Sequence, residues 1–427
     1  MGLGLLRNSS AAIDSKSRLK VDRTRFPSRL CPVCGSSRSK LIYRQSFECF
    51  AAAGNIDGYD VVICRNCGAG FADNIPPQSA FDEYYRELSK YENVSADPTE
   101  PLRVEQRFRD IAGLIVKHIP SQESRVLEIG CATGGLLKVL ADLGFRKLVG
   151  TDPSPACIRA AGEFYGIAGF PATIFTVPVP EEPYEFLILT GVMEHIRDLD
   201  AAINHFQRLL SPSGRVYLEV PDASRYQADQ DAPFQEFSVE HINFFSRKSL
   251  SNLMVARGFR VMETGHTVRP LHEVACPCVY GVFENTMQPT PIDFDNETEV
   301  ALEAYIKGCS AEDTRIRGVI AQSLRPGERM IVWGVGTHTL RLLATGGLDP
   351  ATIALFVDSN PKYQQQQLRG IPIVSPAEIG ARPEPILISS CSSQAAIHRQ
   401  IRCRLALKNP LILLFGTTRL DNGYATV

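Results

Sequence analysis

The sequence lacks an excess of charge, a long apolar run and a dense cysteine framework. Its 45 basic and 47 acidic residues nearly cancel, so the whole chain carries no electrostatic signature of a nucleic-acid or membrane-surface binder. No run approaches the roughly 20 apolar residues of a membrane span, and the apolar stretch near the start is too short for a secretory signal. A hydrophobic content of 44% and a charged content of 22% are those of an ordinary globular protein.

Cysteine use also differs from that of a secreted protein held together by disulfides. Twelve cysteines are spread over 427 residues, and four of them stand in two CxxC pairs. This usage favours free thiols and a metal site in a reducing compartment, so we expect a cytoplasmic protein. A chain of this length can bury more than one core, and two or three domains are expected.

The two cysteine pairs carry a specific local signal. Each is followed by glycine, in Cys31-Pro-Val-Cys34-Gly35 and Cys64-Arg-Asn-Cys67-Gly68. A CxxC turn brings two thiolates within about 4 Å, and the glycine allows the positive φ of a zinc knuckle. Two such turns complete a closed, structural four-cysteine zinc site with no position open for catalysis. The alternative is four unconnected buried thiols.

Strands and helices alternate from residue 125 onward, which predicts a doubly wound parallel sheet with helices on both faces. Strands are expected at 125–130, 147–152, 172–176, 186–190, 215–220 and 259–264, and helices at 103–118, 136–143 and 249–257. Between Pro221 and Phe245 the pattern stops, and we expect this long polar insert to be a lid or substrate loop. A connecting helix at 297–307 precedes a second alternating unit, with strands at 329–333, 353–358, 371–374, 385–389 and 411–415 and a helix at 394–405.

This organisation predicts an α/β protein of five parts. They are a disordered tail (1–25), a zinc-binding module (26–75), a sheet domain (76–285), a connecting helix (286–315) and a smaller C-terminal Rossmann-like domain (316–427). The first 44 residues hold ten Lys and Arg against only Asp14 and Asp22. Such a charge run can follow phosphate groups, although it is more often a solvated tail.

The turn after the first strand of the sheet domain points to a cofactor site. The segment Arg125-Val-Leu-Glu-Ile-Gly-Cys-Ala-Thr-Gly134 closes an apolar strand with the acid Glu128 and continues into a turn of small residues. The next strand ends in Asp152, which suits a ribose diol. A dinucleotide site is the alternative, but the acid in the first strand and the missing third glycine differ from the dehydrogenase pattern.

This segment resembles the first motif of class I S-adenosylmethionine-dependent methyltransferases. The resemblance implies that Glu128 faces the positively charged methionine end of the cofactor. Phe186-Leu-Ile-Leu-Thr-Gly-Val-Met-Glu-His195 resembles the family's fourth strand, which ends beside the transferable methyl group. The acid that often follows strand three is not evident, and Thr176 stands in that neighbourhood. The cofactor-binding residues implied are Glu128, Gly130, Ala132, Gly134, Asp152, Thr176 and Thr190.

The insert contains Phe237-Ser-Val-Glu-His-Ile-Asn-Phe-Phe-Ser246, in which His241 follows Glu240 among aromatic residues. A lone histidine is usually a satisfied core or surface residue. A histidine beside a carboxylate can also be a poised general base, because the carboxylate fixes its tautomer or raises its basicity.

A four-cysteine module, a methyltransferase core with Glu240-His241 in its insert and a C-terminal α/β domain follow one another in this chain. This order is similar to that of bacterial sugar C-methyltransferases, which act on nucleotide-linked 4-keto deoxysugars. The resemblance implies S-adenosylmethionine and structural Zn²⁺ as cofactors. It also implies His241 as the base, Glu240 as its partner, and His195 and Tyr91 as residues near the sugar. Where the family carries a tyrosine three residues before the histidine, this chain has Ser238, which leaves O-methylation open.

The C-terminal unit carries a weaker signal of its own. Gly334-Val-Gly336 with Asp358 mimics a nucleotide fingerprint but lacks its third glycine. This segment is either a turn needed only for packing or a second ligand-binding site, and the sequence leaves both interpretations open. The family resemblance suggests that this domain closes over the sugar-nucleotide cleft.

Together these features predict a class I methyltransferase that C-methylates a nucleotide-activated keto-deoxysugar. The alternatives are O-methylation of a sugar or other small-molecule hydroxyl and, ranked lower, an RNA methyltransferase that uses the basic zinc ribbon to bind RNA. We expect a nucleotide-sugar or other small-molecule substrate, no nucleic-acid partner, no membrane, and a monomer or weak homo-oligomer.

Overall fold

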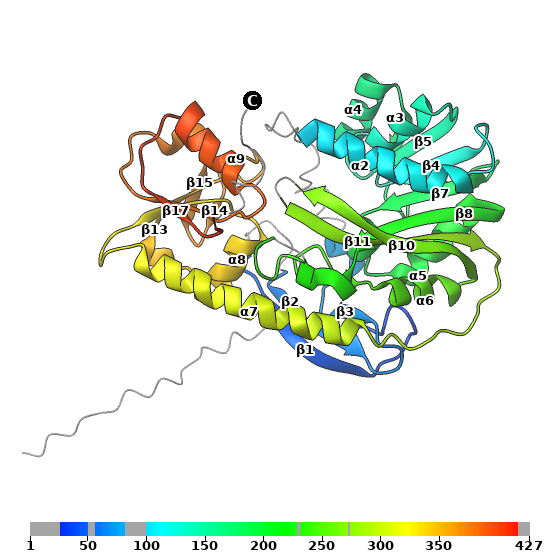
Figure 1. Ribbon diagram of the computed structural model, residues 1–427, viewed down its shortest axis with the longest axis horizontal. Coiled ribbons are helices and arrows are strands. Elements are labelled where there is room, and N and C mark those ends of the chain that lie inside the picture. The colour runs from blue at the N-terminus through cyan, green and yellow to red at the C-terminus, as the bar shows by residue number, and fades with distance from the viewer. Residues whose placement is uncertain (1–25, 50–55, 82–99, 229–230, 272–273, 417–427) are drawn as a thin grey trace, which may run out of the picture.

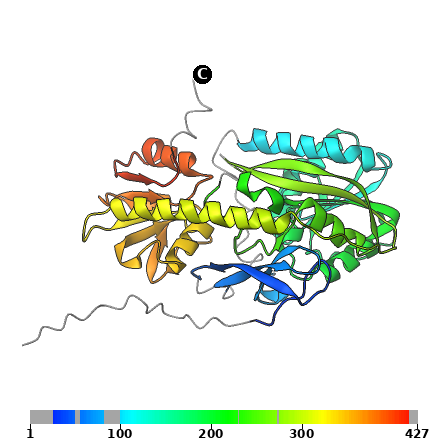
Figure 2. The same cartoon turned by 60° about the horizontal axis from the view of Figure 1, so that its bottom comes forward.

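The computed structural model describes residues 26–49, 56–81, 100–228, 231–271 and 274–416, and this part of the chain folds around three β-sheets (Figure 1). The predicted tail, residues 1–25, lies outside these ranges. The long helix α7 (Thr298–Gln322) runs alongside the other elements from the largest sheet to the C-terminal one (Figure 1, Figure 2). Within the described ranges, every helix falls short of the length and apolar character that a bilayer crossing needs.

The largest sheet has seven strands, and apolar segments bury both of its faces. Its order is β10 (Phe259–Leu271), β11 (Val274–Asn285), β8 (Leu210–Pro221), β7 (Tyr184–Thr190), β4 (Arg125–Ile129), β5 (Lys147–Asp152) and β6 (Ala168–Pro171). Neighbours are parallel from β8 to β6, whereas β11 runs antiparallel to β8 and β10. The sheet is therefore the predicted doubly wound one with an antiparallel strand inserted.

Helices cover both faces of this sheet, as Figure 1 shows. Val126 and Leu127 of β4 are fully buried and belong to different apolar clusters, because successive side chains of a strand point to opposite faces. One cluster includes α2 (Glu100–Ile115), α3 (Gly135–Asp142) and α4 (Pro155–Tyr165). The other includes α5 (Leu199–Leu209) and α6 (Arg247–Val255).

Two details of the predicted strand set are wrong. Residues 172–176 form a turn after β6, since the N–H of Thr173 donates to Oγ1 of Thr176 (2.9 Å) and that of Phe175 donates to Oγ1 of Thr173 (3.3 Å). These side chains bond the backbone groups that a strand would pair. Strand β11 was not predicted, because Pro277 and Gly281 interrupt its alternating pattern.

The N-terminal sheet is antiparallel, in the order β1 (Ser39–Ser46), β2 (Gly58–Cys64), β3 (Gly70–Asp73) and β9 (Asn243–Phe244). Strand β9 comes from the segment predicted to be a polar lid. That prediction is wrong for the described part of the segment, because Tyr226, Phe234 and Phe237 are at most 2% exposed. They pack in one core with Tyr59 of β2 and Leu302 of α7. The segment is therefore a packed wall joined to the N-terminal sheet.

The C-terminal sheet has six strands. Its order is β14 (Gln367–Leu368), β15 (Ile371–Val374), β13 (Ile353–Val357), β12 (Met330–Trp333), β16 (Ile386–Ile388) and β17 (Leu411–Leu413). Strand β14 is antiparallel to β15, and the other five run parallel to one another. The helices of this unit are α8 (Thr337–Ala344) and α9 (Gln394–Arg399), the latter continued by η6 (Gln400–Arg404). Helix α7 is longer than the predicted connecting helix and shares its apolar cluster with this sheet and the N-terminal one.

Candidate active site

The turn between β4 and α3 adopts backbone conformations that favour glycine. Gly130 and Gly134 have φ of 80°, and Ala132 has φ of 46°. A Cβ at Gly130 would lie 2.7 Å from Cγ2 of Val192, in the loop after β7. Asp152 holds the turn, because its Oδ2 accepts the N–H of Ala132 at 3.0 Å. The structure thus brings the predicted cofactor turn and Asp152 together.

Glu128 near the end of β4 is only 3% exposed, and its Oε2 has no hydrogen-bond partner among the described residues. Burial raises the pKa of Glu128 to about 8 against the charge of Arg107, and the charge of Asp152 adds to the rise. A buried carboxylate oxygen without a partner is costly in isolation, so the pocket favours a ligand that brings a cation. The charged methionine end of S-adenosylmethionine fits this requirement.

Glu128→Gln is expected to remove most of the pH dependence of S-adenosylmethionine binding. The cation binds the ionised carboxylate, which is a minority form at pH 7 when the pKa is about 8. The affinity of the wild type should therefore rise about tenfold from pH 7 to pH 9. Calorimetry at both pH values on the wild type and the variant separates this effect from titration of the ligand's own ammonium group. Identical pH curves for the two proteins would contradict the assignment.

A buried charge network that the sequence analysis did not identify lies beside this pocket. Nη2 of Arg107 in α2 donates to Oε1 of Glu219 in β8 at 2.7 Å, and Oγ1 of Thr267 donates to Oε2 at 2.8 Å. Burial alone would raise the pKa of Glu219, but Arg107 and Arg269 outweigh it and lower the pKa. Only the fold places a cation of α2 over β8, so the sequence offered no local signal for this network.

Two histidines lie together beyond the end of β7. His195 belongs to the short η2 turn (Met193–His195), His241 precedes β9, and their ring centroids are 5.1 Å apart. The N–H of Ile242 donates to the carbonyl of Glu194 at 2.9 Å and ties the two segments together. Nδ1 of His195 lies 2.9 Å from the carbonyl oxygen of Glu240. A carbonyl only accepts, so this nitrogen carries the proton. Burial lowers the pKa of His195.

The carboxylate at ion-pair distance from His241 is not the predicted one. Oε2 of Glu236 lies 3.4 Å from Nδ1 of His241, whereas Glu240, the predicted partner, offers its carbonyl oxygen to His195. Burial alone would lower the pKa of His241, but contact with Glu236 and the charges of Glu194 and Glu240 outweigh it and raise the pKa. Glu236 stands five residues before the histidine, and sequence proximity pointed to the wrong acid.

Glu236→Gln is expected to move the acid limb of the pH–rate profile to lower pH. The charge of Glu236 raises the pKa of His241, so its removal lets the imidazole lose its proton at lower pH. The plateau rate should fall by less than the about 10²–10⁴-fold that loss of a general base costs. Glu240→Gln is the matched comparison. A larger shift in that variant than in Glu236→Gln would restore Glu240 as the partner of His241.

The remaining predicted site residues, Thr190, Thr176 and Tyr91, differ in where the structure places them. Thr190 ends β7 and is half-buried. Thr176 is exposed in the turn after β6, where its hydroxyl contacts Thr173. Tyr91 lies outside the described residues. Ser238 holds the backbone beside His241, because its Oγ accepts the N–H of His241 at 3.1 Å.

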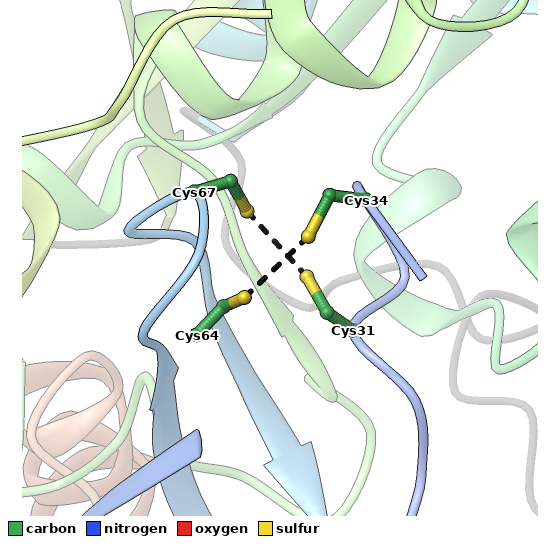
Figure 3. Close-up of side chains that lie close together, drawn as sticks. All are labelled: Cys31, Cys34, Cys64 and Cys67. Carbon is green, nitrogen blue, oxygen red and sulfur yellow. Dashed lines mark hydrogen bonds between the residues drawn. The ribbon is translucent and has the colours of Figure 1, made fainter. Parts of the chain in front are cut away.

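The four predicted zinc ligands converge (Figure 3). Sγ of Cys31 lies 3.6 Å from that of Cys67, the sulfurs of Cys34 and Cys64 are 3.5 Å apart, and all four lie within 4.8 Å of one another. Tetrahedral zinc with Zn–S bonds of about 2.3 Å places sulfurs about 3.8 Å apart. The glycine after each pair has positive φ, as a knuckle requires. The donor set and its spacing therefore fit Zn²⁺.

The C-terminal GxG turn is held like the cofactor turn. Oδ2 of Asp358 accepts the N–H of Val335 at 3.0 Å, and Gly334 has φ of 100°. The same acid-to-turn bond joins Asp152 and Ala132. This similarity shows that the bond is part of the architecture of both units, and it leaves the two interpretations of the C-terminal turn open.

Comparison with known proteins shows a similarity to methyltransferases. Residues 103–264 match the family model described as a methyltransferase domain. A ubiquinone biosynthesis O-methyltransferase of Methylobacterium sp. is 27% identical over 150 residues, which are 30% of this chain and 60% of that protein. A probable S-adenosylmethionine-dependent methyltransferase of Mycobacterium tuberculosis is 22% identical over 31% of this chain and 48% of its own length. The chain thus spans less than two thirds of either relative.

Among solved structures, magnesium protoporphyrin IX methyltransferase of Synechocystis PCC 6803 with bound S-adenosylmethionine aligns with a TM-score of 0.37. It is 14% identical, over 50% of this chain and 98% of its own. The assignment depends on the family match and on the turn that holds Glu128 and Asp152, not on this alignment. Residues 103–264 therefore form a methyltransferase domain, and the glycine turn held by Asp152 and the similarity to S-adenosylmethionine-dependent relatives support a class I enzyme.

Proposed function

We propose that the protein transfers a methyl group from S-adenosylmethionine to a carbon of a nucleotide-linked 4-keto deoxysugar, with His241 as the general base. The observation that carries this proposal is the pair of buried His195 and half-buried His241 beyond the end of β7, with Glu236 3.4 Å from Nδ1 of His241. Strand β7 neighbours β4, so this pair and the Glu128 turn lie at the same edge of the sheet. A carbon nucleophile needs such a base, because a C–H bond must first lose its proton.

In this mechanism a ketone acidifies the neighbouring C–H bond, and His241 takes the proton on Nε2. Glu236 stabilises the imidazolium that forms, since its carboxylate lies 3.4 Å from Nδ1. His195 carries its proton on Nδ1, so its Nε2 is a hydrogen-bond acceptor, and we assign this acceptor to a sugar hydroxyl. S-adenosylmethionine, held by Glu128 and the turn around Asp152, supplies an electrophilic methyl group when it is bound. The N-terminal sheet and the packed insert exclude water from the reacting groups as two walls.

We also propose that Cys31, Cys34, Cys64 and Cys67 hold a structural Zn²⁺. The metal closes the β2–β3 end of the N-terminal sheet, whose β3 pairs with β9 two residues after His241. Four thiolates leave no open coordination position, so this ion fixes a wall of the site and takes no part in the chemistry.

O-methylation of a small-molecule hydroxyl is the second candidate, and two observations favour it. Ser238, which bonds the backbone of His241, replaces the phenol of the sugar C-methyltransferases. A relative is named as a ubiquinone biosynthesis O-methyltransferase. In this version His241 would deprotonate a hydroxyl group.

The direct test is incubation of the metal-loaded protein with isotopically labelled S-adenosylmethionine and a panel of 4-keto sugar nucleotides. Mass spectrometry detects the transferred methyl group, and product NMR separates a methyl on carbon from a methoxy group. A C-methyl product supports the leading proposal. A methoxy product would instead support O-methylation, the second candidate. If no member of the panel is methylated, 4-keto sugar nucleotides are excluded as the substrate class.

A further inference from the structure

A second cluster of metal-ligating side chains lies apart from the four cysteines. Glu194 and His195 from η2 and His241 from the insert each offer a ligand atom, and these atoms lie within 4.8 Å of one another. Two imidazoles and a carboxylate form a common donor set for zinc sites that keep a fourth position open. The cluster contains no thiolate, which distinguishes its chemistry from that of the cysteine site.

The two imidazoles are oriented as metal-binding histidines are. Nδ1 of His195 lies 2.9 Å from the carbonyl oxygen of Glu240, and its Nε2 lies 3.7 Å from Oε1 of Glu194. Nδ1 of His241 faces Glu236 at 3.4 Å, so each imidazole has an acceptor on the Nδ1 side. An acceptor on the far nitrogen fixes the tautomer of a ligating histidine and raises its basicity.

Glu194 supplies an independent observation. It is 1% exposed, and neither carboxylate oxygen has a hydrogen-bond partner in the described part of the chain. Nη2 of Arg269 lies 3.7 Å from Oε1 of Glu194, too far for a hydrogen bond. The carboxylates of Glu194, Glu236 and Glu240 outnumber the guanidinium of Arg269, so the surroundings of the cluster are negatively charged when its imidazoles are neutral. A dication satisfies both the charge and the unbonded oxygens.

We propose that Glu194, His195 and His241 bind a second Zn²⁺ and that this ion reversibly inhibits methyl transfer by occupying the lone pair of His241. Tetrahedral zinc needs ligand atoms about 3.4 Å apart, close to the 3.7 Å between Glu194 and His195. The fourth position is left for water. The binding site stands on the geometry alone, whereas the inhibition also rests on the proposed base role of His241.

Metal stoichiometry tests the site without any substrate. Protein whose cysteine site is filled with one equivalent of Zn²⁺ is titrated with Co²⁺. The wild type should take up about one further equivalent, with d–d bands but no thiolate charge-transfer band. Glu194→Gln and His195→Ala should lose that equivalent, while His205→Ala, in a histidine of α5 outside the cluster, should keep it. Glu236→Gln should weaken it about 10–100-fold. S-adenosylmethionine binding by each variant confirms that it is folded.

Several results would overturn the proposal. The first is that the wild type binds no second equivalent of metal. The second is a thiolate charge-transfer band on the added cobalt, and the third is full retention of the second equivalent in both Glu194→Gln and His195→Ala. Turnover at rising Zn²⁺ tests the inhibitory part, where we expect loss of rate with the occupancy measured by titration and recovery on mild chelation. Unchanged turnover at full occupancy would refute inhibition. The metal stoichiometry is measured without a sugar nucleotide. It therefore still tests the second metal site if the sugar-nucleotide assay gives no product.

Discussion

His241→Asn is expected to lower turnover by about 10²–10⁴-fold while the affinity for S-adenosylmethionine stays within about twofold. Asparagine keeps much of the shape of the side chain but cannot accept a proton near neutral pH. The predicted cofactor site around Glu128 and Asp152 is built from β4, β5 and the turns after them, so this substitution should leave it intact. Single-turnover rates measure the chemical step, and calorimetry measures cofactor binding.

The matched control is His205→Asn, in which a histidine of α5 loses a hydrogen bond to the carbonyl of Val177 outside the site. It should retain wild-type turnover. Full activity of His241→Asn would remove His241 from the mechanism. Equal losses of turnover and cofactor affinity would indicate a structural role for His241.

Much of the cofactor region could be predicted from the sequence, because its determinants are local. Glu128, the small residues of the turn and Asp152 stand within 25 positions of one another and act through the backbone of a single strand–turn–helix–strand unit. Each cysteine pair could be predicted in the same way, because a CxxC turn is local: the N–H of Gly35 donates to the carbonyl of Cys31, and that of Gly68 to the carbonyl of Cys64. The approach of one turn to the other depends on the antiparallel N-terminal sheet.

The surroundings of His241 could not be predicted in this way, because they depend on packing between distant segments. Burial of Phe234 and Phe237 turns the insert into a wall and brings Glu236, not the adjacent Glu240, to Nδ1 of His241. Arg107 reaches Glu219 from a helix more than a hundred residues earlier in the chain. Polar composition suggested a lid or substrate loop, but a few aromatic residues in it were enough to bury the described part of the segment.

Metal removal is expected to have the largest effect on stability. Cys64→Ser should destabilise the N-terminal sheet by several kcal/mol, because structural zinc sites in small peptides contribute an apparent free energy of about 10–16 kcal/mol. Cys64 is fully buried at the end of β2, and the carbonyl of Cys67 accepts the N–H of Asp295 at 2.8 Å. Thermal unfolding and zinc content by elemental analysis measure the loss. Cys403→Ser, which changes an exposed thiol of η6, is the matched control and should match the wild type.

Loss of the metal should also slow catalysis, because β9 connects the N-terminal sheet to His241. Strand β3 pairs with β9 at Phe71 and Asn243, and Nδ2 of Asn243 donates to the carbonyl of Met193, so the N-terminal sheet, the segment after His241 and η2 form one connected unit. Cys64→Ser should therefore lower turnover at a temperature where the protein still binds S-adenosylmethionine, and hydrogen exchange should show loss of protection at β9. Wild-type thermal stability and zinc content in this variant would refute the metal site. A loss of stability with unchanged turnover would show that the wall is not needed to position His241.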